Sequence, residues 1–332
     1  MGEINKFKAP LRAPFGVCLW VSDSCNLNCK YCYAKPFSGH LMDSDRLLEL
    51  IDELIACKVF DITLAGGEPL LHPKIFEVIN KATSGGIRVG LLTNGVSLDK
   101  TKIAYLERTT IKENLIIQVS LDSLDESIND YSRGKSKVVI NNLERLRKSS
   151  LEVQLACVVH SKNRKTAHEI IDHFYPDIHR FHFLNVQRTE SSLIHDDLLL
   201  TEEEASEFWL NLNEHKKKFP EDLFLPSLRI QMRAKGVAEL DSNHSLHQEA
   251  TLDCSSCVAA LTHINIDANF NVLGCDIAKD YTFMGNVAKR TFLDVWNSKE
   301  ADEIRKSKYP PCYKIKDFDN KSLEIHLKPE YI

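Results

Sequence analysis

The chain of 332 residues is long for one small domain and short for three, because a domain commonly holds about 100–200 residues. Its hydrophobic content of 43% and charged content of 27% are ordinary for a folded globular protein. A net charge of −5 without a strongly basic block argues against an extended nucleic-acid surface, so no nucleic-acid partner is expected.

The N-terminal segment and the hydropathy of the chain bear on where the protein works. The first residues carry charges with no apolar run behind them, so no secretory signal peptide is predicted. No stretch approaches the about 18 apolar residues of a membrane span. We therefore expect a cytoplasmic protein without a membrane partner. Because that compartment is reducing, the ten cysteines are not expected to form structural disulfides.

Six apolar, β-branched runs alternate with helical patterns along the first two thirds of the chain. The predicted strands are Val17–Ser22, Phe60–Ala65, Ile87–Thr93, Leu115–Leu121, Val153–Val159 and Phe181–Val186. The predicted helices are Ser44–Lys58, Pro73–Ser84, Asp99–Arg108, Val138–Lys148, Thr166–Phe174 and Glu202–Lys218. Asp43 or Ser44 can cap the first helix, and Ser97 can cap the third.

Six strand–helix units in series predict a parallel sheet with right-handed crossovers. The strands are continuous apolar runs rather than alternating ones, so both faces of the sheet are expected to be buried. An open doubly wound sheet and a partial barrel both satisfy this pattern. In either fold, the active site belongs at the C-terminal ends of the strands.

Chemically distinctive residues follow four of the predicted strands. Cys25 follows the first, Gly66-Gly67-Glu68-Pro69 the second, Thr93-Asn94-Gly95 the third and Asp122 the fourth. Because parallel strands end at the same edge of a sheet, these motifs are expected to converge on one site.

Three cysteines, Cys25, Cys29 and Cys32, lie within eight residues directly after the first predicted strand. A 4Fe–4S cluster held by three thiolates keeps one iron without a protein ligand, and that iron can chelate S-adenosylmethionine (SAM). One electron can then cleave the sulfonium and release a 5′-deoxyadenosyl radical, while the protein positions the cofactors. A zinc site is the alternative, but zinc usually needs four ligands and no histidine lies near this triad.

The order of four motifs resembles the radical SAM superfamily. The motifs are Cys25-x3-Cys29-x2-Cys32, Gly66-Gly67-Glu68-Pro69, Thr93-Asn94-Gly95 and Ser120-Leu121-Asp122. The resemblance covers residues from about 15 to 190 and implies a partial (β/α)6 TIM-like barrel. It also implies that the three clustered cysteines bind the SAM-binding 4Fe–4S cluster.

The same resemblance implies SAM contacts outside the cysteine triad. Tyr31 would lie near the adenine, Glu68 would accept from the SAM ammonium, and the adjacent glycines would let the backbone approach it. The residues assigned to SAM are Tyr31, Gly66, Gly67, Glu68, Asn94, Ser120 and Asp122. For Asp122 the alternative is a cap on a helix at Leu124–Asn129. Asn163, after strand five, resembles a position that also contacts SAM in some members of the family, and a loop cap is its alternative.

A second group of cysteines lies in the last third of the chain, after a stretch from about Phe219 to Leu252 where the pattern weakens. Its members are Cys254, Cys257, Cys275 and Cys312. Four soft ligands suit zinc or an iron–sulfur cluster. Around them, His263–Asp267 and Asn271–Gly274 predict a hairpin, and Thr291–Lys306 predicts a helix.

This C-terminal segment resembles the auxiliary-cluster extension called SPASM or Twitch. A full SPASM extension carries about seven cysteines, so four suggest the shorter Twitch form with one auxiliary 4Fe–4S cluster, and structural zinc is the alternative. The predicted organisation is a radical SAM core at 15–220, a connector at 221–251 and a small cysteine-rich α+β auxiliary domain at 252–332.

The resemblance implies hydrogen abstraction from a substrate C–H bond. The preferred interpretation is maturation of a ribosomally synthesised peptide, by crosslinking, epimerisation or a related change, with flavodoxin or ferredoxin as reductant. The alternative is a small-molecule dehydrogenase or a cofactor or natural-product biosynthesis enzyme. A non-catalytic iron–sulfur or zinc protein is the rival from another class. Candidate substrate contacts near the ends of strands five and six are His160, His182, Asn185, Gln187 and Arg188.

Overall fold

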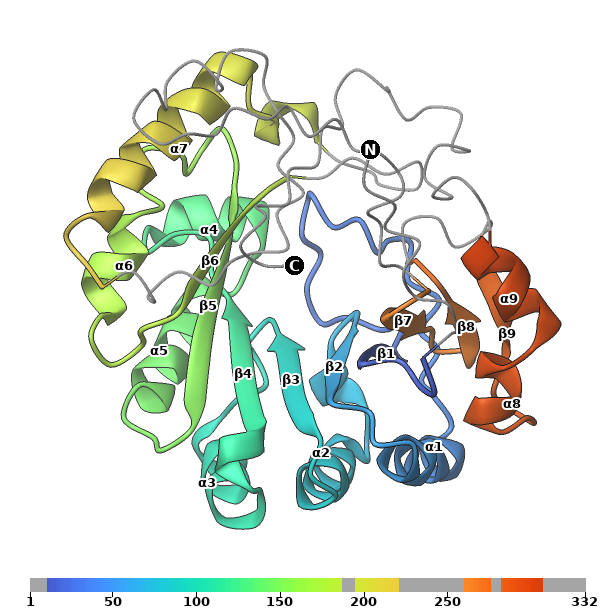
Figure 1. The fold of residues 1–332 in the computed structure, drawn as a ribbon. Helices are drawn as coiled ribbons and strands as arrows, with labels where there is room; N and C mark the ends of the chain where they lie inside the picture. Colours follow the sequence, from blue (N-terminus) through green and yellow to red (C-terminus); the bar gives the residue numbers. More distant parts are fainter. Residues whose placement is uncertain (1–10, 187–194, 221–259, 276–281, 307–332) are drawn as a thin grey trace.

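The computed structural model describes residues 11–186, 195–220, 260–275 and 282–306. Its nine strands form one sheet in the order β6-β5-β4-β3-β2-β1-β7-β8-β9. The strands from β6 to β7 run parallel, and β8 and β9 complete the sheet antiparallel. The sheet curves without closing, with helices along its outer face (Figure 1). The predicted partial barrel is therefore confirmed, and an open doubly wound sheet with helices on both faces is excluded.

The predicted strands agree with the observed ones to within one residue at each end. The six core strands are β1 Gly16–Ser22, β2 Asp61–Gly66, β3 Arg88–Thr93, β4 Leu115–Ser120, β5 Glu152–Val159 and β6 Phe181–Asn185. The helices of this part are α1 Ser44–Ala56, α2 Ile75–Ser84, α3 Lys100–Thr109, α4 Glu126–Ser132, α5 Ser136–Leu146, α6 Glu169–Phe174 and α7 Glu202–Lys216. Short 3-10 turns occupy η1 Pro69–Leu71, η2 Lys112–Asn114 and η3 Asp196–Leu198.

The expectation that both faces of the sheet are buried is wrong for much of the inner face, although Gln154 and Ala156 of β5 are buried there. In β4, for example, Leu115, Ile117 and Val119 are fully buried while Ile116, Gln118 and Ser120 stay half-buried. Strands β2 and β3 alternate in the same way. In the described part of the chain the helices lie along the outer face, and the inner face keeps partial access to solvent (Figure 1). The barrel interior can therefore receive a ligand.

Local sequence explains the helix boundaries, with two corrections. Asp43 caps α1 by accepting from the Arg46 backbone N–H at 2.9 Å, as predicted. The third helix is capped by Asp99, which accepts from two backbone N–H groups, and not by Ser97. Helix α4, capped by Asp125, lies later than the expected Leu124–Asn129 and holds only seven residues. Such a short, polar helix lacks the apolar period that reveals longer ones.

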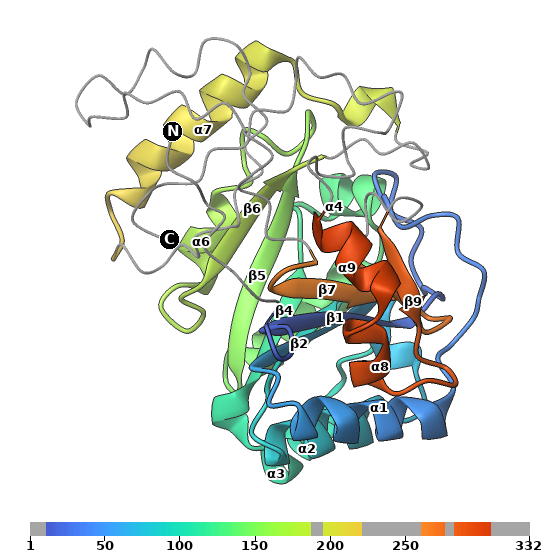
Figure 2. The same cartoon turned by 45° about the vertical axis from the view of Figure 1, so that its right-hand side comes forward.

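The C-terminal residues extend the barrel sheet. The predicted hairpin is present as β7 His263–Ile266 and β8 Asn271–Leu273, followed by β9 Phe283–Asn286. The single predicted helix is two, α8 Phe292–Trp296 and α9 Lys299–Lys306, because the Ser298 hydroxyl caps a new helix by accepting from Ala301 N at 3.2 Å. Helix α8 lies against α1 (Figure 2).

Polar contacts hold this extension to the barrel. Arg46 of α1 donates to the carbonyl of Val287 at 2.8 Å, and the Trp296 indole donates to the carbonyl of Leu11 at 2.8 Å. Among the described residues, no helix combines the length and apolar character required to cross a membrane.

Candidate active site

Cys25, Cys29 and Cys32 lie on the loop that leaves β1, and all three are half-buried. Burial raises the pKa of the Cys25 and Cys29 thiols, and the neighbouring cysteines add to the rise. Lys35 holds the loop by donating to the carbonyl of Cys29 at 2.7 Å. Among the cysteines that the structure describes, none forms a disulfide.

These residues fit a 4Fe–4S cluster. Three soft thiol donors share one tight loop, remain unbridged, and act electrostatically on one another. Their partial exposure leaves a side open to a further ligand. Three protein ligands with one open position match a cluster that binds a substrate-like cofactor better than a closed structural zinc site.

Gly66 and Gly67 bring the end of β2 against the backbone that precedes Cys25. A Cβ on Gly66, whose φ is +129°, would lie 2.2 Å from the carbonyl oxygen of Ser22, and one on Gly67 would lie 2.2 Å from that of Ser24. The Gly67 N–H donates to Ser22 O at 2.7 Å. The close approach seen in the structure is therefore to the cysteine loop. The predicted approach of these glycines to SAM remains a prediction.

Glu68 is fully buried and joins the ends of β2 and β3. Its carboxylate accepts from the Thr93 hydroxyl at 2.7 Å, the Asn94 N–H at 2.8 Å and the Leu70 N–H at 3.1 Å. Burial raises the pKa of Glu68, and these hydrogen bonds oppose the rise. The resemblance implies that Glu68 also accepts a hydrogen bond from the SAM ammonium, which would be the fourth donor to this carboxylate.

Asn94 lies beside the cysteine loop. Its amide nitrogen donates to the Asn26 side chain at 2.7 Å and lies 3.8 Å from Cys25 Sγ, while its oxygen accepts from Val96 N at 3.0 Å. Ser120 lies at the end of β4, half-buried, two residues before Asp122. The motifs from four strand ends thus converge on one edge of the barrel, as expected.

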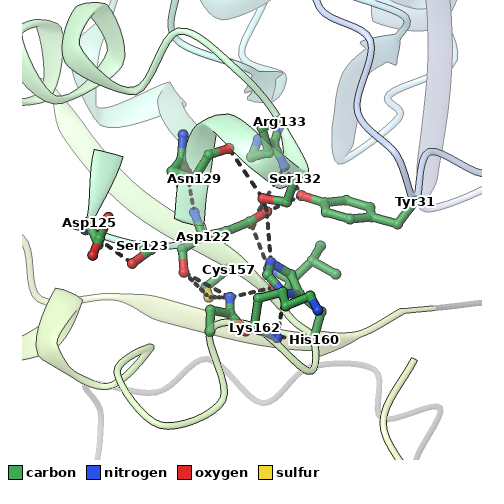
Figure 3. A network of polar contacts seen from close by, with 12 residues as sticks. Tyr31, Asp122, Ser123, Asp125, Asn129, Ser132, Arg133, Cys157, His160 and Lys162 are labelled. Carbon is green, nitrogen blue, oxygen red and sulfur yellow. Dashed lines mark hydrogen bonds and ion pairs between the residues drawn. The ribbon is translucent and has the colours of Figure 1, made fainter. Parts of the chain in front are cut away.

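Asp122 lies at the centre of a buried polar network (Figure 3). Its carboxylate accepts from the Tyr31 hydroxyl, from the Ser132 hydroxyl at 3.0 Å and from the Val158 N–H at 3.0 Å. Since Asp125 is the cap of α4, the helix-cap interpretation of Asp122 is wrong. The carboxylate instead holds Tyr31, one of the two residues between Cys29 and Cys32.

Arg133 is a component of this network that the sequence did not indicate. Its guanidinium donates to the Tyr31 hydroxyl at 2.6 Å and lies 3.7 Å from Asp122 Oδ1. Tyr31 and Arg133 are 102 positions apart in the sequence. Arg133 also follows a helix that is too short to be recognised from periodicity. A lone arginine before a glycine carried no usable signal.

The structure shows where His160 and Asn163, two residues predicted to lie near the site after β5, are placed. His160, an expected substrate contact, is fully buried with Nε2 4.0 Å from Asp122 Oδ2, and burial lowers its pKa. Asn163 caps the loop, since its amide donates to Asp122 O at 2.8 Å and its oxygen accepts from His160 N at 2.8 Å. On β6, His182 and Asn185 remain half-buried, each with a buried polar atom that lacks a hydrogen-bond partner in the described residues.

Only one cysteine of the C-terminal group lies in the described residues. Cys275 directly follows β8, where its N–H donates to the Thr282 hydroxyl at 3.1 Å and its carbonyl accepts from that hydroxyl at 3.0 Å. The predicted ligands Cys254, Cys257 and Cys312, and the substrate candidates Gln187 and Arg188, lie outside the described residues.

His72 anchors the turn that presents Glu68. Its Nε2 lies 2.9 Å from the carbonyl of Met42, and its Nδ1 accepts from Lys74 N at 3.2 Å, an arrangement that requires the neutral ring. Burial lowers the pKa of His72 in the folded chain. The neutral ring therefore stabilises the fold at pH values above the unfolded-state pKa of about 6.5. This stabilisation is lost as the pH falls through the lower pKa of the folded state. We expect His72→Gln to flatten the dependence of the urea midpoint on pH between pH 7.5 and 5. An unaltered slope in the His72 variant would contradict this assignment.

A partial parallel barrel with a three-cysteine loop after its first strand defines a class of enzymes that combine an iron–sulfur cluster with SAM. Comparison with known families agrees. The radical SAM superfamily matches residues 21–174, and the iron–sulfur cluster-binding SPASM domain matches residues 257–315. The chain belongs to the radical SAM superfamily and carries a SPASM-type domain in its C-terminal part. Together these domains imply a SAM-binding 4Fe–4S cluster, SAM, and auxiliary iron–sulfur clusters.

Several relatives have assigned roles. The sporulation killing factor maturation protein SkfB of Bacillus subtilis is 27% identical over 165 residues, which are 48% of this chain and 39% of that protein. An S-adenosylmethionine-dependent nucleotide dehydratase of Flammeovirga pacifica is 28% identical over 60% of this chain and 71% of that protein. The match to SkfB therefore spans well under half of that relative's length.

The fold is also similar to that of a solved structure. Streptococcus suis SuiB, determined with the precursor peptide SuiA, superposes with a TM-score of 0.70 at 17% identity, over 90% of this chain and 68% of SuiB. At this identity the likeness concerns the fold, and it covers both the barrel and much of the C-terminal part.

Proposed function

We propose that this protein is a radical SAM enzyme that modifies a ribosomally synthesised peptide. The observation that carries the proposal is the convergence of the cysteine loop with the ends of β2, β3 and β4 above a half-open barrel interior. SkfB is named for the maturation of a killing factor, and SuiB binds a precursor peptide. Both support a peptide substrate.

The division of labour at the site follows from the contacts. Cys25, Cys29 and Cys32 would hold the cluster, which together with SAM would supply one-electron cleavage of the sulfonium and hence a radical able to abstract hydrogen. Glu68 fixes the ends of β2 and β3 against each other through its three hydrogen bonds. Asn94 orients the start of the cysteine loop through Asn26.

The reaction also needs a source of electrons and a place for the substrate. A one-electron step requires a reductant, and a flavodoxin or ferredoxin in the cytoplasm fits that need. The auxiliary site, formed by Cys275 with Cys254, Cys257 and Cys312, would hold a second 4Fe–4S cluster in the domain proposed at 252–332, after the core at 15–220. Substrate would reach the inner face of the barrel, where the ring Nε2 of His182 has no hydrogen-bond partner among the described residues.

A small-molecule substrate is the second candidate. The nucleotide dehydratase relative matches over a larger share of its length than SkfB does. The half-buried inner face of the barrel also carries polar side chains, Thr63, Gln118 and His182 among them, which suit a polar metabolite as well as a peptide backbone.

The two candidates separate in one experiment. The full chain is reconstituted with iron and sulfide, reduced, and supplied with SAM and either a precursor peptide encoded beside its gene or a panel of nucleotides. For a peptide-modifying enzyme, we expect a change in peptide mass that depends on SAM and accompanies 5′-deoxyadenosine formation. His182→Ala should raise the peptide KM while the substrate-free rate of SAM cleavage stays the same. A mass change confined to nucleotides would replace the proposal with the second candidate.

A further inference from the structure

A cluster of metal-ligating side chains lies away from the cysteine loop, on the outer surface between α6 and α7. His168 and Asp172 are four residues apart at the start of α6, and His215 lies in the last turn of α7. One ligand atom from each lies within 4.8 Å of the others. Residues four apart share one face of a helix, so the sequence directs both α6 ligands toward α7.

The separations suit a single transition-metal ion. Zinc bound by nitrogen and oxygen at about 2.0–2.2 Å has ligand atoms about 3.3–3.5 Å apart in a tetrahedron. His215 Nε2 and Asp172 Oδ1 are already 3.0 Å apart, and the rings of His168 and His215 have centroids 4.8 Å apart. Small side-chain rotations therefore complete a three-ligand site. The donor set of two imidazoles and one carboxylate suits Zn²⁺, Ni²⁺ or Cu²⁺.

Helix α7 has a structural need for such a clamp. Of its 15 residues, only Phe208 and Leu212 are fully buried, so its apolar contact with the barrel is small. In the part of the chain that the structure describes, the last turn of α7 meets α6 through the hydrogen bond of His215 to Asp172, whose side chain is 49% exposed, and the ring contact of His215 with His168. The ion pairs of Arg164 with Glu204 and Glu207 lie nearer the other end of α7. A cation at this end of α7 also meets the negative end of the helix dipole.

We propose that His168, Asp172 and His215 form a binding site for one divalent transition-metal ion, with Zn²⁺ as the typical occupant. The ion joins the last turn of α7 to α6 and leaves one coordination position for water. The site is chemically independent of the cysteine ligands, because it offers only nitrogen and oxygen donors. It therefore serves the position of α7 and takes no part in SAM cleavage.

Zinc uptake by the reconstituted full chain tests the proposal. After both cluster sites are filled with iron and sulfide, equilibrium dialysis against ZnCl₂ should show one zinc per chain that depends on His215. His215→Ala and His168→Ala should each weaken this binding by at least about 10-fold, which is a loss of about 1.4 kcal/mol. With Co²⁺ as the probe, the visible spectrum should lack the sulfur-to-metal charge-transfer band that cysteine ligands produce.

His173→Ala is the matched control, because His173 is an exposed histidine of the same helix that contacts Glu144 instead. This variant should bind zinc as the unmodified chain does, and zinc should raise the unfolding temperature of both. If His215→Ala and His168→Ala take up as much zinc as the control, or if the Co²⁺ spectrum shows sulfur ligation only, the three residues form no metal site. In that case the contact of His215 with Asp172 is a simple hydrogen bond between helices.

Discussion

Replacing Cys29 with alanine is expected to remove the SAM-cleaving activity altogether. The reconstituted variant should contain about four fewer irons per chain and produce 5′-deoxyadenosine only at the background rate. The reason is that three thiols are the whole protein ligand set offered by this loop, so the loss of one leaves two irons without a protein ligand. None of the other cysteines that the structure describes lies on this loop, because they are found on β1, at the end of α1, on β5 and after β8.

The fold should survive this substitution. Cys29 is half-buried on a loop and packs against a small apolar group that includes Tyr31 and Leu198, apart from the main core. Cys57→Ala is the matched control, since Cys57 is also half-buried but caps the end of α1. Iron content and 5′-deoxyadenosine formation should be unchanged in that variant. If Cys29→Ala formed 5′-deoxyadenosine at the full rate, this loop would not hold the cluster that cleaves SAM.

Asp122→Asn is expected to destabilise the folded chain by about 3–5 kcal/mol, the usual cost of removing one partner from a buried charge pair. The substitution keeps the shape of the side chain but removes the charge that faces Arg133, whose side chain is only 11% exposed. It also places an amide donor opposite the Tyr31 and Ser132 hydroxyls. Urea unfolding followed by circular dichroism measures the free energy of unfolding.

Because the same network holds Tyr31, the variant should also lose SAM cleavage at temperatures where it is still folded. Asp125→Asn is the control three residues along, since asparagine caps helices about as well as aspartate and this side chain is exposed. Its free energy of unfolding should change by less than about 0.5 kcal/mol. In the double variant Asp122→Asn/Arg133→Met, the loss should be smaller than the sum of the single losses. Additive losses would show that the two side chains are not coupled.

The chain order of the elements was predictable because each strand is an apolar run between turn signals, and each longer helix repeats its apolar residues every three to four positions. In α1, for instance, Leu47, Leu50, Ile51 and Leu54 are the buried residues. The bounds of helix α4 were predicted two to three residues too early because it buries only Asn129 and Ser132, and the break between α8 and α9 depends on the serine cap at Ser298.

The ligand loop was also readable from the sequence, since Cys25, Cys29 and Cys32 are close in the chain and their spacing alone defines a three-thiol site. The contacts that hold this loop in place could not be read from the sequence. The predicted contacts of Glu68 and of the two glycines before it with SAM stay a prediction. The structure adds that these residues also hold the cysteine loop and its neighbouring strand ends.

The sequence by itself therefore determined that parallel strands alternate with helices, the order of these elements along the chain and the three-cysteine loop, because all of these are written in local spacing and periodicity. Only the tertiary structure decided that Tyr31, Asp122 and Arg133 form one buried unit, that His160 is buried, and that the inner face of the barrel remains half-open. The physical reason is that burial and charge pairing depend on which distant segments meet, and no local pattern in the chain encodes that meeting.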